Sequence, residues 1–224
     1  RQRLTAALRG EFERALAQLH QHDSSGGNAS GGALDRQLAL YAEGDPASKL
    51  QLFHNIGQGS YKDVAPDLGM DVIGDAETPV WGDFDCDGWP DLFVPFYAHL
   101  PPWRSFLWRN NHDGTFTDIS LDAGVALENQ PGPLRPEGAA AVDWNGDGSL
   151  DLYCAQHLFL NDGSGHFTDA RAQTGLPELF DEGAKFVDVD GDGDLDLYLR
   201  TWNGPQLFRN DNGQFTEITS EAGL

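Results

Sequence analysis

Most of the chain alternates apolar and polar residues over short stretches that end at Gly, Asn or Asp. Between 185 and 219, for example, the letters KFVDV, DLYLR, QLFRN and QFTEIT alternate over four or five residues each. A period of two places successive side chains on opposite faces of a strand, and Gly or Asn between stretches favours tight turns. The pattern predicts four short strands in each unit of about 50 residues.

The first fifty residues follow a different pattern. Apolar residues recur at helical spacing from Leu4 to Leu19 with Arg and Glu between them, which predicts an amphipathic helix. Residues 22–32 have the composition of a flexible Gly/Ser linker, and residues 33–44 favour a short second helix. We therefore expect a helical extension over residues 1–49 and a repeat region over residues 50–224.

One phrase, which contains an invariant asparagine, returns four times along the repeat region. It reads LFHN, LWRN, LFLN and LFRN, followed each time by a Gly-containing turn and an aromatic strand. A second phrase, rich in aspartate, lies between successive asparagine phrases, so that three complete units follow a leading half. The anchor asparagines of the first phrase are Asn55, Asn110, Asn161 and Asn210.

Four short strands repeated about every 50 residues are typical of a β-propeller blade, which buries each face against a neighbour. A β-sandwich with Asp-rich turns is the alternative, but it does not explain the regular return of both phrases. Propellers have about 4–8 blades, and three and a half blades seldom close a ring. We therefore expect a mainly β chain whose blades form an incomplete propeller, either a fragment or an arc completed by other chains.

The aspartate phrases read D-x-[DN]-x-D-G-x-x-D, a spacing that predicts calcium loops. Carboxylates at alternate positions of a tight loop converge on one point, the glycine allows the sharp turn, and position seven can add its backbone carbonyl. Ca²⁺ suits such an oxygen cage better than Mg²⁺, which demands a rigid octahedron, or Zn²⁺, which favours His and Cys. The candidate ligands of three Ca²⁺ sites are Asp83, Asp85, Asp87, Trp89, Asp91, Asp143, Asn145, Asp147, Ser149, Asp151, Asp188, Asp190, Asp192, Asp194 and Asp196.

Other interpretations of these loops fit less well. An EF-hand is excluded because its position twelve is a bidentate Glu, whereas Val94, Cys154 and Leu199 stand there. Metal-free turns are the remaining alternative, since Asp and Asn hydrogen-bond their own backbone in turns. Three such loops in register would hold many carboxylates in repulsive proximity without a cation, which favours the metal.

The two phrases resemble the FG-GAP and VCBS repeats of integrin-α-like β-propellers. LFRNDNGQFTEITSEAGL and FVDVDGDGDLDLYL look most like the repeats of cartilage acidic protein and its bacterial relatives, the ASPIC-type repeat proteins. The resemblance covers about residues 50–224 and implies calcium-loaded blades in secreted, surface or periplasmic proteins that bind proteins or glycans without catalysis. Two features depart from that pattern: the helical first fifty residues, and three acidic loops where such propellers have about seven blades.

The composition of the chain excludes several classes of binding partner. Lys and Arg number 14 against 36 Asp and Glu, a formal net charge of −22 that repels nucleic acid and anionic lipid surfaces. No apolar run reaches the ~18 residues of a membrane-spanning helix. The two cysteines, Cys86 and Cys154, stand at different offsets in their repeats, so a disulfide between them is possible but unsupported.

Few other residues suggest chemistry. No nucleophile elbow, P-loop or zinc-protease motif occurs, so no enzyme activity is expected. Trp81 and Trp108 fall within strand patterns and are expected to pack between blades, whereas Trp89 and Trp103 are candidates for contact with a protein or sugar. Asn28 begins a glycosylation sequon that matters only in a eukaryotic secretory protein.

The sequence therefore predicts a non-enzymatic calcium-binding β-propeller module that provides a rigid surface for protein interaction, adhesion or assembly. A calcium-dependent glycan-binding module is one alternative, and a scaffold or regulatory domain of a larger, possibly enzymatic assembly is another. Oxygen-ligand loops of this kind are usually tuned to high calcium. The expected location is thus extracellular, periplasmic or organelle-lumenal rather than cytosolic.

Overall fold

The computed structural model describes residues 49–224, apart from 71, 75, 97–103, 128–137 and 179–180. The chain divides into two units, Arg1–Gly44 and Asp45–Leu224, and the described residues belong to the second. The predicted helices, the Gly/Ser linker, Asn28 and Trp103 all lie outside the described residues. Within the described part, no helix combines the length and hydropathy needed to cross a membrane.

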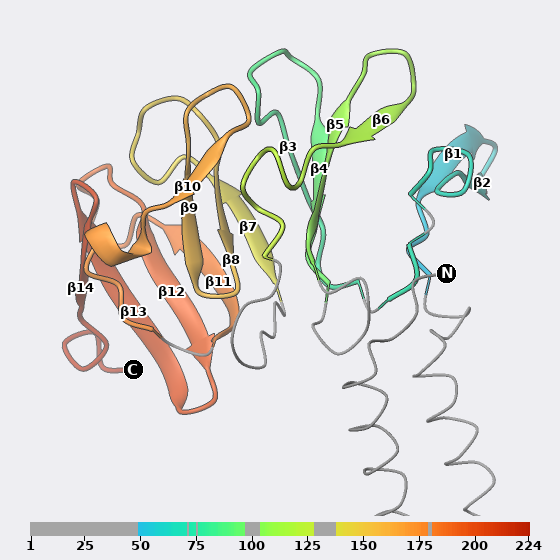
Figure 1. Ribbon diagram of the computed structural model, residues 1–224. Helices are drawn as coiled ribbons and strands as arrows, with labels where there is room; N and C mark the ends of the chain where they lie inside the picture. The colour runs from blue at the N-terminus through green and yellow to red at the C-terminus, as the bar shows by residue number, and fades with distance from the viewer. Residues whose placement is uncertain (1–48, 71, 75, 97–103, 128–137, 179–180) are drawn as a thin grey trace, which may run out of the picture. The chain divides into compact units, whose positions relative to one another are not determined.

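The described region is mainly β, with one two-stranded hairpin followed by three four-stranded sheets (Figure 1). The leading hairpin consists of β1 (Phe53–Gly57) and β2 (Ser60–Asp63). Sheet 1 consists of β3 (Val80–Gly82), β4 (Asp91–Val94), β5 (Phe106–Asn110) and β6 (Phe116–Asp118). Sheet 2 consists of β7 (Ala139–Val142), β8 (Asp151–Cys154), β9 (His157–Asn161) and β10 (Phe167–Asp169). Sheet 3 consists of β11 (Asp181–Val187), β12 (Asp196–Thr201), β13 (Gly204–Asp211) and β14 (Gln214–Glu217).

Each four-stranded sheet is an antiparallel meander in which consecutive strands are neighbours. The predicted four strands per unit are therefore confirmed for the three complete units. No described sheet closes on itself, and the arrangement of the blades as an incomplete propeller stays a prediction. One short 3₁₀ helix, Arg171–Gln173, follows sheet 2.

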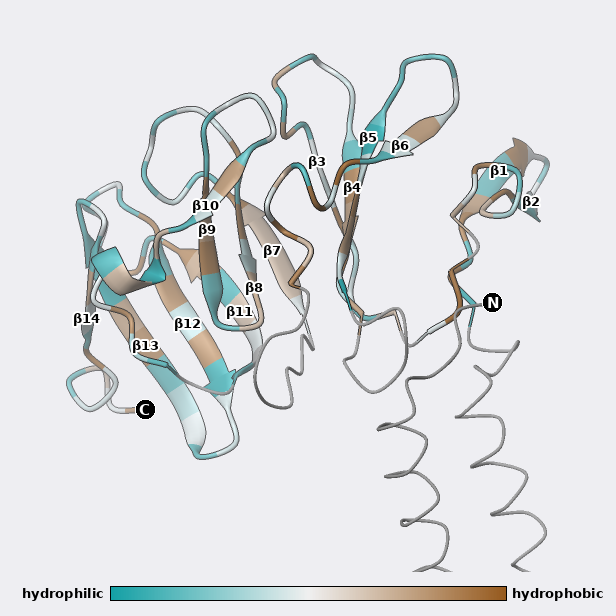
Figure 2. Cartoon of the chain, viewed as in Figure 1, coloured by the Kyte–Doolittle hydropathy of each residue, from teal (hydrophilic) through white to brown (hydrophobic). Residues whose placement is uncertain are grey.

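Consecutive apolar residues in the second strand of each four-stranded sheet point alternately to its two faces, so both faces are apolar. Figure 2 shows the hydropathy of these strands. In β4, Leu92 packs in a cluster with Ala65 and Met70 of the segment after β2, while its neighbour Phe93 packs toward sheet 2. Sheet 2 repeats the arrangement, with Leu152 facing sheet 1 and Tyr153 facing sheet 3. The core thus consists of layers between successive units rather than one central cluster.

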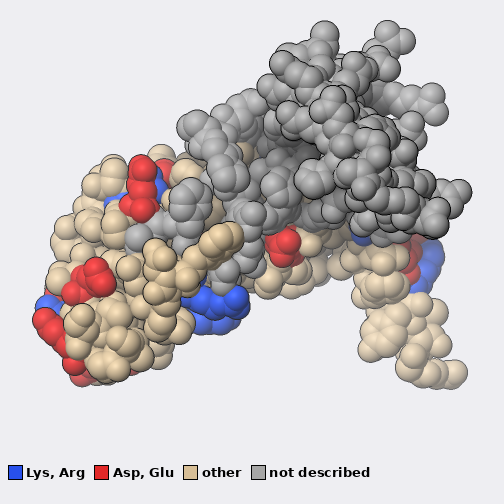
Figure 3. Space-filling model, turned by 90° about the horizontal axis from the view of Figure 1, so that it is seen from below, with Lys and Arg blue, Asp and Glu red and all other residues tan. Residues whose placement is uncertain are grey.

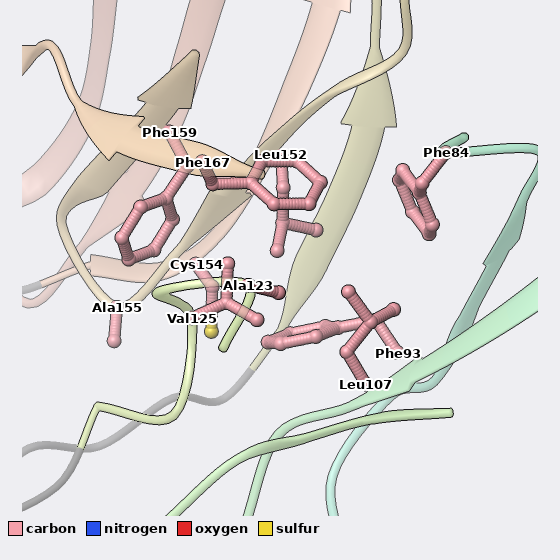
Figure 4. Close-up of a cluster of buried hydrophobic side chains, with 10 residues drawn as sticks. All are labelled: Phe84, Phe93, Leu107, Ala123, Val125, Leu152, Cys154, Ala155, Phe159 and Phe167. Carbon is pink, nitrogen blue, oxygen red and sulfur yellow. The ribbon is translucent and has the colours of Figure 1, made fainter. Parts of the chain in front are cut away.

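Figure 4 shows the layer between sheets 1 and 2. Phe84, Phe93 and Leu107 enter it from sheet 1 and its first loop, and Leu152, Phe159 and Phe167 enter it from sheet 2. The rings of Phe84 and Phe167 meet edge to face, with centroids 5.7 Å apart, as aromatic pairs prefer. Ala123 and Val125, in the segment after β6, complete the same layer.

The burial of two tryptophans and the state of the two cysteines can be compared with the sequence-based expectations. Trp108 is buried as expected, but Trp81, on the edge strand β3, is half exposed. Its ring meets that of Phe116 edge to face within the same sheet. The packing predicted for Trp81 is therefore wrong. Both cysteines are free thiols, Cys86 exposed and Cys154 buried, so the possible disulfide is not formed.

Candidate metal centre

The three acidic loops occupy the same place in the three sheets. Each joins the first strand to the second, and we call 83–91 the first loop, 143–151 the second loop and 188–196 the third loop. The glycine at position six adopts a left-handed backbone in all three loops, with φ between 89° and 100°. Position four is also left-handed, and there the first loop places Cys86 where the other two have glycine.

The aspartate at position one shapes each turn. Asp83 accepts hydrogen bonds from the backbone N–H groups of Asp87 and Gly88, at 3.0 and 2.9 Å. Asp143 makes the same pair of bonds in the second loop. Asp188 accepts from Gly191 and Gly193 in the third. These carboxylates therefore stabilise the tight winding that brings the later positions together.

The aspartate at position nine is buried in every sheet and ties the loop to the third strand. Asp91, Asp151 and Asp196 each accept a hydrogen bond of 2.8 Å from the backbone N–H of the anchor asparagine on that strand. Burial raises the pKa of Asp91 to about 6 and that of Asp151 to about 7. Removal from water disfavours the charged form, and a bound cation would reverse that effect.

In two loops, three carboxylates converge. Oxygens of Asp83, Asp85 and Asp87 lie within 4.8 Å of one another, and so do oxygens of Asp188, Asp190 and Asp196. Burial, followed by the charge of Asp87, raises the pKa of Asp85. Such like-charged oxygens repel one another, so the arrangement fits a hard cation that prefers oxygen ligands.

Among the described residues, two buried carboxylate oxygens also lack hydrogen-bond partners. They are Oδ1 of Asp85 in the first loop and Oδ2 of Asp151 in the second. A buried acceptor without a donor is costly unless an ion or water satisfies it. Carboxylate oxygens line both places, a donor set that suits a hard cation.

The remaining candidate ligands are not all brought into these clusters. Both oxygens of Asp91 accept backbone bonds, from Phe84 and Asn110. In the second loop the side-chain amide of Asn145 donates to Asp147, at 2.8 Å, and no three carboxylates converge among the described residues of that loop. Asp192 accepts from the Asp194 N–H, and Asp194 accepts from Asn212 N–H. The backbone carbonyls of Trp89, Ser149 and Asp194 stay predicted ligands.

Comparison with known families identifies the repeats. The family model described as FG-GAP-like repeat matches residues 36–94 and 97–154, which together make up more than half of the chain. The chain belongs to the FG-GAP-like repeat family. The FG-GAP-like match ends with β8, yet sheet 3 repeats the strand order and acidic loop of the matched units. The narrower likeness to ASPIC-type repeats stays a prediction.

Two solved structures are similar to parts of this FG-GAP-like chain. The biofilm matrix protein Bap1 of V. cholerae matches with 20% identity and a TM-score of 0.46, over 77% of this chain and 24% of that one. An Agrocybe aegerita lectin, described as recognising non-reducing terminal N-acetylglucosamine, matches with 17% identity and a TM-score of 0.29, over 75% of this chain and 60% of that one. The chain thus spans less than two thirds of either. No curated protein matches it.

The structure adds a contact that sequence reasoning missed. Nδ2 of Asn161 donates both to the Leu150 carbonyl of its own loop and to the Phe84 carbonyl of the preceding loop, at 2.8 and 2.7 Å. Asn210 repeats this with Leu195 and Trp144. The anchor asparagine therefore joins consecutive acidic loops. Its invariance in the four FG-GAP-like phrases was the available signal.

The first loop carries a second unforeseen contact at its surface. The indole of Trp89 stacks on the imidazole of His112, with ring centroids 5.3 Å apart, and His112 Nε2 hydrogen-bonds to Asp87. His112 lies in the turn between β5 and β6, which topology places at the same end of sheet 1 as the first loop. Trp89 is 48% exposed, so an aromatic surface adjoins the loop.

Proposed function

We propose that this chain is a non-enzymatic calcium-binding module of β-propeller type, whose stacked sheets form a rigid surface for protein interaction or assembly. The observation that carries the proposal is the acidic loop that recurs at one position of three sheets, with converging carboxylates in the first and third. Membership of the FG-GAP-like repeat family supports it.

Each loop would hold Ca²⁺ through its own oxygen atoms. In the first loop these are the carboxylates of Asp83, Asp85 and Asp87, and in the third those of Asp188, Asp190 and Asp196. In the second loop, the unpartnered Asp151 Oδ2 and the Asn145 carbonyl oxygen would contribute. The ion would supply positive charge that offsets carboxylate repulsion, and it would thereby fix the loops that the anchor asparagines join.

Surface charge supports an interaction role outside the cytosol. On the face seen in Figure 3, Asp and Glu side chains gather at the end of the described surface over sheet 3. A strongly acidic surface suits Ca²⁺ and basic protein partners and disfavours nucleic acid. Calcium loops of modest affinity fill only where calcium is high, so we place the module in an extracellular, periplasmic or lumenal compartment.

Calorimetric titration of the full chain with CaCl₂ tests the metal assignment. Calcium should bind and should raise the melting temperature, because a ligand that binds only the folded state adds roughly 2.7 kcal/mol per site at a hundredfold excess over Kd. Asp85→Asn and Asp190→Asn should each weaken one site. Asp122→Asn, an exposed acid outside the loops, is the matched control. Identical melting curves in chelator and in millimolar CaCl₂ would refute the proposal.

A calcium-dependent glycan site is a second candidate, favoured by the exposed Trp89 ring beside the first loop. The apolar C–H face of a sugar ring can pack against an exposed aromatic ring. A glycan array probed with the full chain in CaCl₂ should then show signals that Trp89→Ala abolishes and that Trp202→Ala, an exposed indole in the β12–β13 turn, leaves intact. Equal loss with both variants, or no signal at all, counts against a glycan site.

A further inference from the structure

The leading hairpin exposes the face that later units bury. Phe53 is 56% exposed and Tyr61 is 62% exposed. In the asparagine phrases of the three sheets, the residue equivalent to Phe53 is buried against the preceding unit, as Trp108, Phe159 and Phe208. The equivalents of Tyr61 pack in the same layers, as Phe116, Phe167 and Phe215. The hairpin thus presents an aromatic face built to meet a preceding sheet.

Sheet 3 exposes the opposite face. Val187 and Val189 are 48% and 46% exposed, and Tyr198 is half-buried. Their equivalents in sheet 2 are all buried against sheet 3, as Val142, Trp144 and Tyr153. We call this side of sheet 3 the outward face. It presents the apolar residues that a following unit covers in sheets 1 and 2.

The leading hairpin and sheet 3 also carry the polar groups that join successive units elsewhere. Among the described residues, Asn55 Nδ2 has no acceptor, whereas Asn161 and Asn210 donate to the carbonyl at position two of the preceding loop. The carbonyl at position two of the third loop belongs to Val189. A matching donor and acceptor are therefore present at the two ends of the described region.

The segment after the last strand of each sheet makes a further contact with the next unit. The Phe167 N–H donates to the Ala123 carbonyl, and the Phe215 N–H to the Thr174 carbonyl. A Cβ on the following glycine, Gly124, would lie 2.8 Å from the Phe167 oxygen, so only glycine fits there. The equivalent Gly223 after sheet 3 and Gly69 after the leading hairpin meet no atom within 4 Å, so this close glycine contact is made only between the complete sheets.

We propose that the outward face of sheet 3 binds the leading hairpin of a second copy of this chain, head to tail. The second copy is the occupant because its hairpin carries the two aromatic side chains, the amide donor and the N–H that the third and fourth strands contribute to the interfaces between sheets. In this contact, Phe53 and Tyr61 of the second copy cover Tyr198 and Val189. Such a heterologous contact closes into a ring or continues into a filament. It concerns sheet faces and not the acidic loops, so it is tested separately from calcium binding.

Sedimentation velocity of the full chain over a range of concentrations tests the contact. The wild type should form dimers and larger species. Phe53→Glu and Tyr198→Glu should each raise the dissociation constant at least about tenfold, since a charge is placed at the centre of an apolar interface. Leu121→Glu, an exposed leucine outside both faces, is the matched control and should associate as the wild type does.

Mixing the two face variants provides the decisive measurement. Each variant retains one intact face, so an equimolar mixture of Phe53→Glu and Tyr198→Glu should form a dimer and nothing larger. That outcome requires both variants to be folded and the contact to be head to tail. A wild type that stays monomeric at ~100 μM, well above Kd values of specific interfaces, would overturn the proposal. So would association that survives either variant, or a mixture that stays monomeric.

Discussion

At the scale of single residues, the anchor asparagines carry more of the architecture than their size suggests. Asn161 is buried, and its side chain donates to one carbonyl in its own loop and one in the preceding loop. Its Oδ1 accepts from the N–H groups of Gly163 and Gly165 in the β9–β10 turn. One amide therefore satisfies four backbone groups, two of them in buried hydrogen bonds and two in part-buried ones.

Asn161→Ala should lower the free energy of unfolding by about 2–4 kcal/mol, because buried backbone carbonyls and N–H groups lose their partners together. Asn55→Ala is the matched control: the equivalent side chain in the leading hairpin is exposed and bonds only to Gly57 among the described residues. Its cost should stay below about 1 kcal/mol. Urea denaturation of both variants at low protein concentration gives the comparison. Equal costs would contradict a role for the amide between units.

At the scale of elements, the acidic loop recurs three times in the chain with the same backbone turn, but the three copies differ in their side-chain contacts. The first and third bring three carboxylates together, whereas Asn145 in the second replaces a charge and donates to Asp147. Two position-nine carboxylates have raised pKa values, about 6 for Asp91 and about 7 for Asp151. These groups therefore bind protons near neutral pH when no cation is present.

Calcium affinity should fall as the pH drops from 7.5 to 5.5. Ca²⁺ in the second loop requires an ionised Asp151, which takes up a proton below about pH 7. In the first loop, the charge of Ca²⁺ would favour the ionised form of the neighbouring Asp91, whose pKa is about 6, so binding must release protons. One displaced proton weakens binding roughly tenfold per pH unit below its pKa. The metal-free protein should respond in the opposite direction and lose stability as the pH rises from about 4 to about 7. A carboxyl group whose pKa is raised by folding stabilises the folded state only while that group is protonated.

Titrations at several pH values, each in buffers of different ionisation enthalpy, measure both the affinity and the number of protons released. Mutation of Asp151 to Asn removes its titration and should flatten the pH dependence above pH 6. An affinity independent of pH over this range would show that Asp151 does not hold the ion.

The sequence predicted the strands, the loops and their order because each depends on local chemistry. Alternation along β12 and the glycines of the acidic turns are visible in any copy of the repeat. Contacts between units are not local, and for that reason the bond from Asn161 to Phe84 and the half-exposed position of Trp81 escaped prediction. Which loop carboxylates converge also depends on backbone bonds, such as those that occupy both oxygens of Asp91.

At the scale of the whole repeat region, stability is shared between neighbouring sheets. Sheet 2 contributes Leu152 to the layer with sheet 1 and Tyr153 to the layer with sheet 3. The Tyr153 hydroxyl also donates to the buried carboxylate of Asp181, at 2.8 Å. No sheet therefore has a core of its own, which makes the units depend on one another as in other repeat proteins.

Leu152→Ala should destabilise the protein by about 2–5 kcal/mol, because it leaves a cavity in a layer shared by two sheets. The three sheets of this variant should still unfold in a single transition, so that the loss of stability is shared by all three rather than confined to sheet 2. Leu121→Ala, at an exposed leucine, should change stability by less than about 0.5 kcal/mol. Hydrogen exchange would disprove the shared core if sheets 1 and 3 kept their protection while sheet 2 lost it.

The two thiols differ in exposure, which allows one of them to be labelled selectively. Cys154 lies in the layer between sheets 1 and 2, where burial raises its pKa, so alkylating reagents reach it only after unfolding. Cys86 is exposed at position four of the first loop. A maleimide fluorophore therefore modifies the folded chain at one sulfur atom. Its emission reports on the surroundings of the first loop in the natural sequence, with no engineered substitution.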